Sequence, residues 1–256
     1  MIPPEVESLV ETFIEVCRRI ESKGFVTATD GNVSARLPNG NILSTPAAMN
    51  KGFVQAGDLV EVTPSGAVVA GKRKPSSELD MHLFIYETRP DVKAVVHCHP
   101  VYATAFAAAR IPLAECVFPE VIVGLGAIPL AQYATPSTKE VRHSIEPFVP
   151  SADAILLANH GVVTYGGDLW DAYFKMEKVE HAAHIQFAAR MLGGEKILSA
   201  DDIAKLRRIS AASYGKDFSA KPACEPAPPS ADMPMTEEEL RSIIGEVRRR
   251  LGRTVQ

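Results

Sequence analysis

The chain has 256 residues, of which 46% are hydrophobic and 23% are charged, and its formal net charge at pH 7 is −4. This composition is typical of a globular protein with one large domain or two small ones. The weak negative charge excludes a general attraction to nucleic acid or anionic membranes, and no apolar run approaches the roughly 18 residues of a membrane span. The basic clusters GKRK (71–74) and RRR (248–250) are short and contain no aromatic residues. We therefore expect neither nucleic acid nor membrane as a partner.

The amino-terminal sequence and the cysteines indicate the compartment. The stretch MIPPEVESLVETF does not combine a basic segment with an apolar core, so we expect no signal peptide. The cysteines form no CxxC pair and are scattered along the chain, at Cys17, Cys98, Cys116 and Cys224. This pattern is typical of reduced thiols, and we predict a cytoplasmic protein.

The first hundred residues predict a helix followed by short strands. Apolar residues at helical spacing follow Pro3-Pro4, and the predicted helix ends near Gly24. Alternating segments then predict strands at 32–37, 41–45, 59–63 and 67–71. The triplets P-N-G and P-S-G lie between the members of each pair and favour antiparallel pairing. A helix is predicted to follow PSS (75–77) and to end near Arg89, before the strand AVVHCH (94–99).

The next hundred residues alternate between helices and strands. We predict, in order, a helix of small residues containing TAFAAA, strands near 117–123 and 127–130, a helix from about Ser137, the strand AILLANH (154–160), a helix from about Asp168 to Met191, and a short helix after Ser199. Early strands with helices mixed in later favour a layered α/β domain with much antiparallel pairing.

The carboxyl-terminal part changes composition after about Lys216. The stretch DFSAKPACEPAPPSADMPM has five prolines and few large apolar residues, which predicts an extended linker. A capping box at Thr236 and Glu239 then introduces a helix with one apolar face. We therefore divide the chain into a catalytic domain (1–214), a linker (215–235) and an amphipathic helix (236–256).

Three histidines stand where predicted strands end. Side chains alternate along a strand, so His97 and His99 point to one side while Cys98 points to the other. The strand within ILLANHG (155–161) ends in a third, His160. Three neutral imidazoles with one open position describe a catalytic zinc site, although other divalent transition metals also suit imidazole. We interpret the remaining histidines as surface or packing residues: His82, His143, His181 and His184.

Two turns offer polar groups for catalysis and anion binding. Glu78 lies where a turn becomes a helix, and Ser76 and Ser77 before it could cap that helix or bind an anion at its amino terminus. In TDGNVS (29–34), Gly31 permits an unusual turn and Asn32 offers an amide donor. Each feature alone is also consistent with plain capping or a plain turn.

Taken together, these motifs resemble the class II aldolase family over about residues 5–210. The order GNVSAR, TP, KPSSE, RPDVKAVVHCHPVYATA, YAT and LLANHG is similar to its zinc-dependent group. That group contains L-fuculose-1-phosphate aldolase, L-rhamnulose-1-phosphate aldolase and L-ribulose-5-phosphate 4-epimerase. The resemblance implies a three-layer α/β/α fold with a central, largely antiparallel sheet. It also implies a homotetramer with active sites at the subunit interfaces.

The resemblance assigns roles residue by residue. The implied metal ligands are His97, His99 and His160, with one zinc ion per subunit. The implied acid/base is Glu78, and the implied catalytic tyrosine is Tyr133, in AQYAT. The implied phosphate-binding positions are Gly31, Asn32, Ser76 and Ser77. One departure is that the aldolases typically have TPTG where this chain has TPAA (45–48), which removes a hydroxyl and a glycine from the phosphate pocket.

The implied reaction is cleavage of a ketose 1-phosphate into dihydroxyacetone phosphate and an aldehyde such as lactaldehyde. Tyr133 would handle the proton on the aldehyde's oxygen, and Glu78 would protonate the carbon that becomes part of dihydroxyacetone phosphate. The epimerase typically carries aspartate in place of Glu78, so the glutamate favours an aldolase. A decarboxylase or dehydratase on the same scaffold and a noncatalytic metal-binding scaffold protein are the alternatives. The sequence does not identify the sugar.

The carboxyl-terminal tail has two interpretations. A proline-rich linker before a short amphipathic helix resembles the encapsulation peptides of bacterial microcompartment enzymes. This resemblance implies a shell protein as partner and a location inside a microcompartment. The alternative is a helix that packs within the oligomer.

Overall fold

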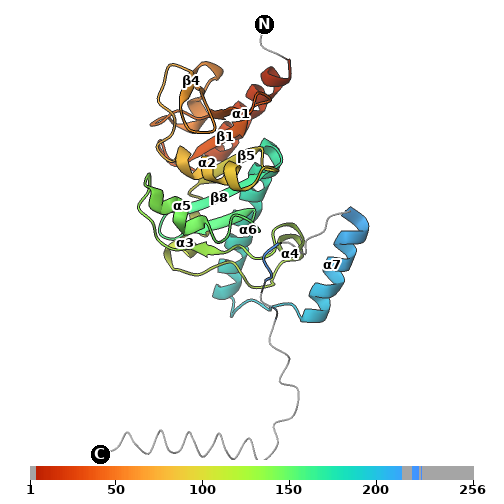
Figure 1. Ribbon diagram of the computed structural model, residues 1–256. Helices are drawn as coiled ribbons and strands as arrows, with labels where there is room; N and C mark the ends of the chain where they lie inside the picture. The colour runs from red at the N-terminus through yellow and green to blue at the C-terminus, as the bar shows by residue number, and fades with distance from the viewer. Residues whose placement is uncertain (1–3, 215–220, 225, 227–256) are drawn as a thin grey trace, which may run out of the picture.

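The computed structural model describes residues 4–214, 221–224 and 226, which form a domain built on one mixed sheet (Figure 1). The strands are β1 (Asn32–Arg36), β2 (Ile42–Ser44), β3 (Val60–Val62), β4 (Val68–Ala70), β5 (Ala94–Cys98), β6 (Leu130–Ala131), β7 (Ala154–Leu157) and β8 (Gly161–Gly166). Their order across the sheet is β4-β3-β2-β1-β5-β8-β7-β6. Every neighbouring pair is antiparallel except β6 and β7.

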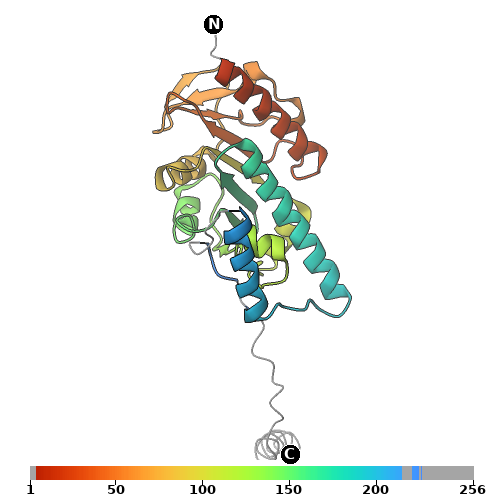
Figure 2. The same cartoon turned by 90° about the vertical axis from the view of Figure 1, so that its right-hand side faces the viewer.

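Helices cover both faces of the sheet. They are α1 (Pro4–Ser22), α2 (Leu79–Thr88), α3 (Val101–Ala108), α4 (Pro119–Gly124), α5 (Lys139–Ile145), α6 (Leu169–Met191) and α7 (Ala200–Tyr214), with short 3-10 helices η1 (Lys51–Phe53) and η2 (Ala56–Asp58). One apolar core joins the sheet to α1, α3 and α6, and a second joins it to α2 and α5. Figure 2 shows α1 (red) and α6 (teal) on one side of the sheet. The predicted three-layer α/β/α fold is confirmed.

Alternation along β5 explains how both cores are filled from one strand. Ala94, Val96 and Cys98 belong to the core under α1, α3 and α6, whereas Val95 belongs to the core under α2 and α5. His97 therefore points toward the α2 side, opposite to Cys98. The strand is buried on both faces because it is central, and this is why its sequence is almost continuously apolar.

Local signals place the helix ends close to where the sequence predicts them. Helix α1 begins at Pro4, carries acidic residues in its first turn, and is followed by Gly24 with a φ of 70°. Helix α6 begins after Asp168, whose side chain accepts a hydrogen bond from the backbone N–H of Asp171. Thr138 caps α5 in the same manner.

Two predictions between residues 117 and 166 are wrong or incomplete. The strand predicted at 117–123 is the short helix α4, which begins with Pro119 at its first turn and buries Val121 and Ile122. The β-branched residues favoured a strand, but burial of one apolar side against α6 and α7 determines the helix. The strand predicted at 127–130 is reduced to β6, and β8 was not predicted.

The cysteine prediction is wrong for one pair. Cys116 and Cys224 form a disulfide, with their Cα atoms 5.2 Å apart, while Cys17 and Cys98 are free and buried. No pattern in the sequence indicates this pairing, because the two residues are 108 positions apart. They meet because residues 221–224 return to the domain.

Residues 221–224, which we call the strap, lie within the predicted linker but contact the domain. The Pro222 carbonyl accepts a hydrogen bond from the Ala127 backbone N–H at 2.9 Å, and the Lys221 ammonium pairs with the Asp153 carboxylate. Cys224 is buried in a small cluster with Ile122 of α4 and Ile203 of α7. The predicted helix at 236–256 lies outside the described residues. Within the described part of the chain, no helix is long and apolar enough to cross a membrane.

Candidate metal centre

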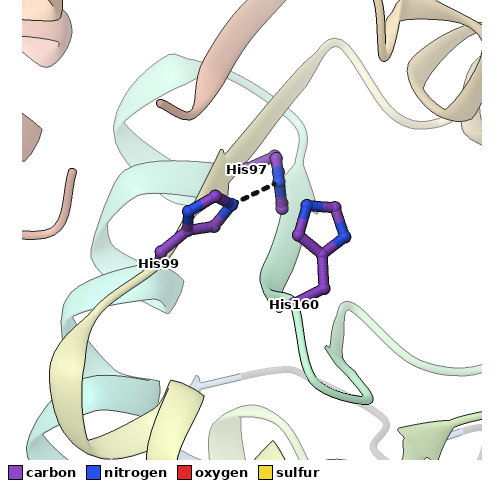
Figure 3. Close-up of side chains that lie close together, drawn as sticks. All are labelled: His97, His99 and His160. Atoms are coloured by element: carbon purple, nitrogen blue, oxygen red, sulfur yellow. Dashed lines mark hydrogen bonds between the residues drawn. The ribbon is translucent and has the colours of Figure 1, made fainter. Parts of the chain in front are cut away.

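Three histidines meet at one edge of the sheet, as the sequence predicts. His97 lies near the end of β5, and His99 follows the strand. His160 lies in the turn between β7 and β8, which reaches β5 because Cys98 pairs with Val162. The ring centroids are 4.7–5.0 Å apart, and Figure 3 shows the three rings facing one another.

The backbone of the turn before β8 permits this approach. Asn159 has a φ of 56°, a left-handed conformation that asparagine tolerates better than most residues. A Cβ on Gly161 would lie 2.5 Å from the Cys98 carbonyl oxygen and 2.5 Å from Cδ2 of His99. Glycine at this position therefore lets the turn carry His160 next to the other two histidines.

Hydrogen bonding fixes the orientation of His97. Its Nδ1 donates to the Val162 carbonyl oxygen at 2.9 Å, so its Nε2 is the nitrogen left to bind a metal. That Nε2 lies 3.1 Å from Nε2 of His99 (Figure 3). His97 is fully buried, so this nitrogen faces the centre of the cluster and not solvent.

The histidine nitrogens suit a divalent metal. One ligand atom from each of the three histidines lies within 4.8 Å of the others. Burial, together with the neighbouring His97 and His160, lowers the pKa of His99 to about 3, so its ring is neutral at pH 7. Neutral imidazoles are the form that binds zinc and similar metals. The three histidines could therefore hold one ion.

Glu78 adds a carboxylate to the cluster. It immediately precedes α2, and its Oε2 lies 3.3 Å from Nε2 of His97 while its Oε1 lies 3.1 Å from Nε2 of His160. Burial alone raises the pKa of the Glu78 carboxyl, but His97 and His160 outweigh burial and hold the pKa well below its usual range. Glu78 is therefore ionised beside the histidines.

Two buried oxygen atoms indicate that the cluster accommodates a cation or a ligand. The Nδ2 of Asn32 donates to Oε2 of Glu78 at 2.9 Å. Among the described residues, Oε1 of Glu78 and Oδ1 of Asn32 are buried without a hydrogen-bond partner. Buried acceptors without donors are rare in proteins. The donor set therefore fits a metal ion together with a hydroxyl-bearing ligand.

A cavity of about 490 Å³ opens beside the cluster and collects most of the predicted site residues. Gly31, Asn32, Ser76, Ser77, Glu78, His99 and His160 line it. The serines precede α2, and the positive end of the α2 dipole favours an anion there. The Ser76 backbone N–H also donates to the Thr45 carbonyl oxygen, which joins the serine turn to the TPAA loop.

Sequence reasoning missed part of the cavity wall. The TPAA loop contributes Pro46, Ala47 and Ala48 as the resemblance implies, whereas Thr29, Asp30 and Pro136 were not singled out. Asp30 lies within the motif TDGNVS, and its carboxylate is 3.8 Å from Nδ1 of His99. A carboxylate near the second nitrogen of a metal-binding histidine commonly orients the ring. No pattern in the sequence distinguished this aspartate from an ordinary turn residue.

Tyr133 is not brought to the cavity within the described chain. It follows β6, is 55% exposed, and does not line the cavity beside the histidines. Its expected action on a neighbouring subunit stays a prediction.

His82 packs beneath the site and is buried, as a packing residue should be. Its Nδ1 lies 2.7 Å from Oγ of Ser34, which also contacts the Tyr86 hydroxyl. Burial lowers the pKa of His82 to about 3, and the charge of His97 acts in the same direction.

A larger cavity of about 620 Å³ lies over α4 and α6. It is lined by residues such as Phe118, Phe174 and Ile185. Within the described residues, the histidine cluster beside the smaller cavity is the one group of side chains arranged to hold a metal. We therefore assign the chemistry to the smaller cavity.

Comparisons with known proteins identify the family of the chain. The model of the Class II Aldolase and Adducin N-terminal domain matches residues 11–187. The chain is 35% identical to an L-fuculose phosphate aldolase of Methanococcus maripaludis, over 68% of this chain and 94% of that protein. It is 34% identical to a 3-oxo-tetronate 4-phosphate decarboxylase of Escherichia coli, over 78% of this chain and 96% of that protein. The crystal structure of YgbL from Klebsiella pneumoniae superposes with a TM-score of 0.72 at 33% identity, covering 78% of this chain and 98% of that one. The chain therefore belongs to the class II aldolase family of enzymes.

Proposed function

We propose that this protein is a zinc-dependent aldolase that reversibly cleaves a ketose 1-phosphate into dihydroxyacetone phosphate and an aldehyde such as lactaldehyde. The observation that carries the proposal is the cluster of His97, His99, His160 and Glu78 beside a cavity at the amino terminus of α2. The substrates we favour are L-fuculose 1-phosphate and L-rhamnulose 1-phosphate. The similarity to an L-fuculose phosphate aldolase supports this choice.

The three histidines would hold the metal, and zinc is the ion we favour because three neutral imidazoles with an open position are typical of catalytic zinc sites. A bound divalent cation supplies positive charge that stabilises the negative charge developing on substrate oxygens during carbon–carbon cleavage. Another divalent transition metal would supply the same charge. Lysine chemistry is not required for this reaction.

Glu78 would transfer the proton at the carbon that becomes part of dihydroxyacetone phosphate. Its carboxylate lies between His97 and His160 and is held by the amide of Asn32. Its low pKa means that it accepts a proton only when substrate changes this environment. Asn32 would therefore orient the Glu78 carboxylate through this hydrogen bond, in addition to its predicted role in phosphate binding.

The phosphate would occupy the cavity next to Gly31, Ser76 and Ser77. The amino terminus of α2 favours negative charge there, and the serine hydroxyls could donate hydrogen bonds. Tyr133 would transfer the proton on the aldehyde's oxygen, acting from a neighbouring subunit of the proposed homotetramer. Its exposure in the single chain supports this arrangement.

Decarboxylation is the second candidate, because one relative is a 3-oxo-tetronate 4-phosphate decarboxylase. Loss of CO₂ from that substrate also leaves dihydroxyacetone phosphate, so the two reactions share a product. They differ in the departing group, since only the aldolase must remove a proton from a departing hydroxyl. The 4-epimerase and dehydratase reactions have no observation of this kind in their favour.

Product analysis separates these candidates. Zinc-loaded protein would be incubated with L-fuculose 1-phosphate, L-rhamnulose 1-phosphate, 5-deoxy-D-ribulose 1-phosphate and 3-oxo-tetronate 4-phosphate. The proposal predicts dihydroxyacetone phosphate and an equal amount of aldehyde from at least one of the ketose phosphates. Release of CO₂ from the tetronate derivative, with no aldehyde from any sugar, would replace the aldolase by the decarboxylase.

We propose that the carboxyl-terminal tail (residues 236–256) acts outside the catalytic domain. The helix predicted at 236–256 would bind a microcompartment shell protein, and the enzyme would then act inside that compartment in the cytoplasm. The alternative is packing of this helix within the tetramer. The apolar face in its sequence supports either partner.

A further inference from the structure

Two loops contribute to the wall of the cavity, and each has a strained position within it or next to it. One wall is formed by residues 29–32 and the other by residues 46–48. Ala28, just before the first wall, has a φ of 50°, and Ala48 in the second has a φ of 54°. Alanine is unfavourable in this left-handed region, so other contacts must hold both loops in place.

Lys51 contacts both walls with one ammonium group. It is the first residue of η1, and it is only 1% exposed. Its Nζ donates to the Thr29 carbonyl oxygen at 2.8 Å and to the Met49 carbonyl oxygen at 2.5 Å. Thr29 belongs to the first wall, and Met49 directly follows Ala48 of the second. One buried side chain therefore connects the two loops.

The neighbouring Asn50 strengthens the same connection. Its Nδ2 donates to the Ala28 carbonyl oxygen at 2.9 Å, and its Oδ1 accepts from the Gly52 backbone N–H at 2.8 Å. The side chains of Asn50 and Lys51 thus bind consecutive carbonyl groups, at Ala28 and Thr29. These two hydrogen bonds hold the backbone at Ala28, which has a strained φ angle.

Burial of an ammonium group is costly, which indicates a purpose beyond packing. Burial lowers the pKa of Lys51, while Cys17, Cys98 and Asp30 act in the opposite direction. An apolar side chain of similar length would fill the space without this cost. An apolar side chain could not donate hydrogen bonds to both loops, as Lys51 does.

We propose that Lys51 is a positioning residue that holds the two backbone walls at the separation needed to receive the phosphate of the substrate. The inference rests on the proposed function for the identity of that ligand as a sugar phosphate. It also accounts for TPAA in place of TPTG. Ala48 occupies a conformation that glycine would adopt without strain, and the Lys51 contact at Met49 secures it.

The central variant is Lys51→Met, which keeps the length of the side chain and removes its donors. We expect KM for the ketose 1-phosphate to rise at least tenfold while kcat changes less than threefold and metal content stays at the wild-type level. Loss of binding shared by ground state and transition state appears in KM. Amide hydrogen exchange should become faster at 28–32 and 46–50 and should be unchanged in β8. The matched control is Lys93→Met, because Lys93 is exposed and donates only a long hydrogen bond to Pro90.

Equilibrium binding of inorganic phosphate separates this proposal from the proposed reaction. We expect the dissociation constant of phosphate to rise at least tenfold in Lys51→Met, whether or not the wild type cleaves any sugar. If the wild type binds phosphate but cleaves none of the ketoses, the reaction is wrong and Lys51 keeps its assignment. If Lys51→Met does not fold, Asn50→Ala tests the same connection and should change phosphate binding in the same direction. Unchanged KM and phosphate binding, or loss of metal and kcat at unchanged KM, would overturn the proposal.

Discussion

At the scale of single residues, the chemistry of the site depends on which nitrogen of His97 is hydrogen-bonded and on the ionisation of Glu78. The Nδ1 of His97 is committed to the Val162 carbonyl, so its other nitrogen faces His99 and Glu78. Glu78 is ionised because the imidazoles outweigh its burial. The carboxylate is therefore both close to the proposed metal and able to accept a proton when substrate displaces it.

A comparison of the variants Glu78→Gln and Tyr133→Phe tests whether the two residues transfer different protons. We expect Glu78→Gln to fold and to slow the exchange of the dihydroxyacetone phosphate carbon-bound proton with deuterium by about 100-fold or more, which is typical for loss of a general base. Tyr133→Phe should impair aldol cleavage while leaving this exchange measurable by NMR. Equal loss of both activities in both variants would show that the roles are not divided in this way.

His82 predicts a pH dependence of stability in the metal-free protein. Its pKa is about 3 in the fold and about 6.5 when unfolded, so the unfolded chain binds the extra proton between these values. The free energy of unfolding should therefore be constant above about pH 6.5 and fall on acidification, with up to about 1.4 kcal/mol per pH unit from this group. The groups around it are Ser34, Tyr86, His97 and Glu78.

Urea unfolding at a series of pH values measures this contribution. His82→Gln should flatten the slope between pH 4 and 6 by about one proton, whereas the exposed His143→Gln should not change it. An identical slope in wild type and His82→Gln would contradict the assignment of this proton to His82.

At the scale of elements, the two strands that lead into the histidines, β5 and β7, were predicted correctly, and the contacts between loops were not. The apolar runs before His97 and His160 specify central strands, and alternation correctly placed Cys98 opposite His97. Val121 and Ile122 were misread as strand because burial against neighbouring helices, which a sequence does not show, determines α4. The contact of Lys51 with Thr29 depends on two loops meeting in space, so no local pattern could reveal it.

Gly161→Ala tests how tightly the turn before β8 is held against β5. The added Cβ would meet the Cys98 carbonyl and the His99 ring, so the turn must shift. We expect a loss of about 1–3 kcal/mol in the free energy of unfolding, as for other overpacked sites. Metal affinity should fall at least tenfold in a competition titration with a chelator. The control is Gly167→Ala, where the Cβ meets nothing within 4 Å, and wild-type affinity in Gly161→Ala would contradict the account.

At the scale of the whole molecule, the strap joins the end of the described chain to the domain. The disulfide links residues 108 positions apart, and the Lys221–Asp153 ion pair and the Ala127–Pro222 hydrogen bond lie beside it. None of these contacts reaches the histidine cluster. The strap should therefore affect stability without affecting chemistry, and the proposed tail function begins only beyond it.

Two truncations separate the strap from the tail. Ending the chain after Pro226 keeps the strap, and we expect unchanged tetramer, metal content and catalysis. Ending it after Lys216 removes the strap and should lower the free energy of unfolding by about 2–4 kcal/mol under oxidising conditions, the range typical of a native disulfide. Dithiothreitol should reduce this difference. Dissociation of the tetramer after the first truncation would show that the tail is an assembly element and not a shell-binding peptide.

The most direct test of the central claim is a zinc titration of metal-stripped protein, with release of dihydroxyacetone phosphate from a ketose 1-phosphate as the signal. The account predicts negligible release without metal, a rise that saturates at one equivalent of zinc per chain, and no rise in His97→Ala, because two imidazoles make a poor site. Full release from the stripped wild type, or zinc-dependent release in His97→Ala equal to that of the wild type, would contradict it.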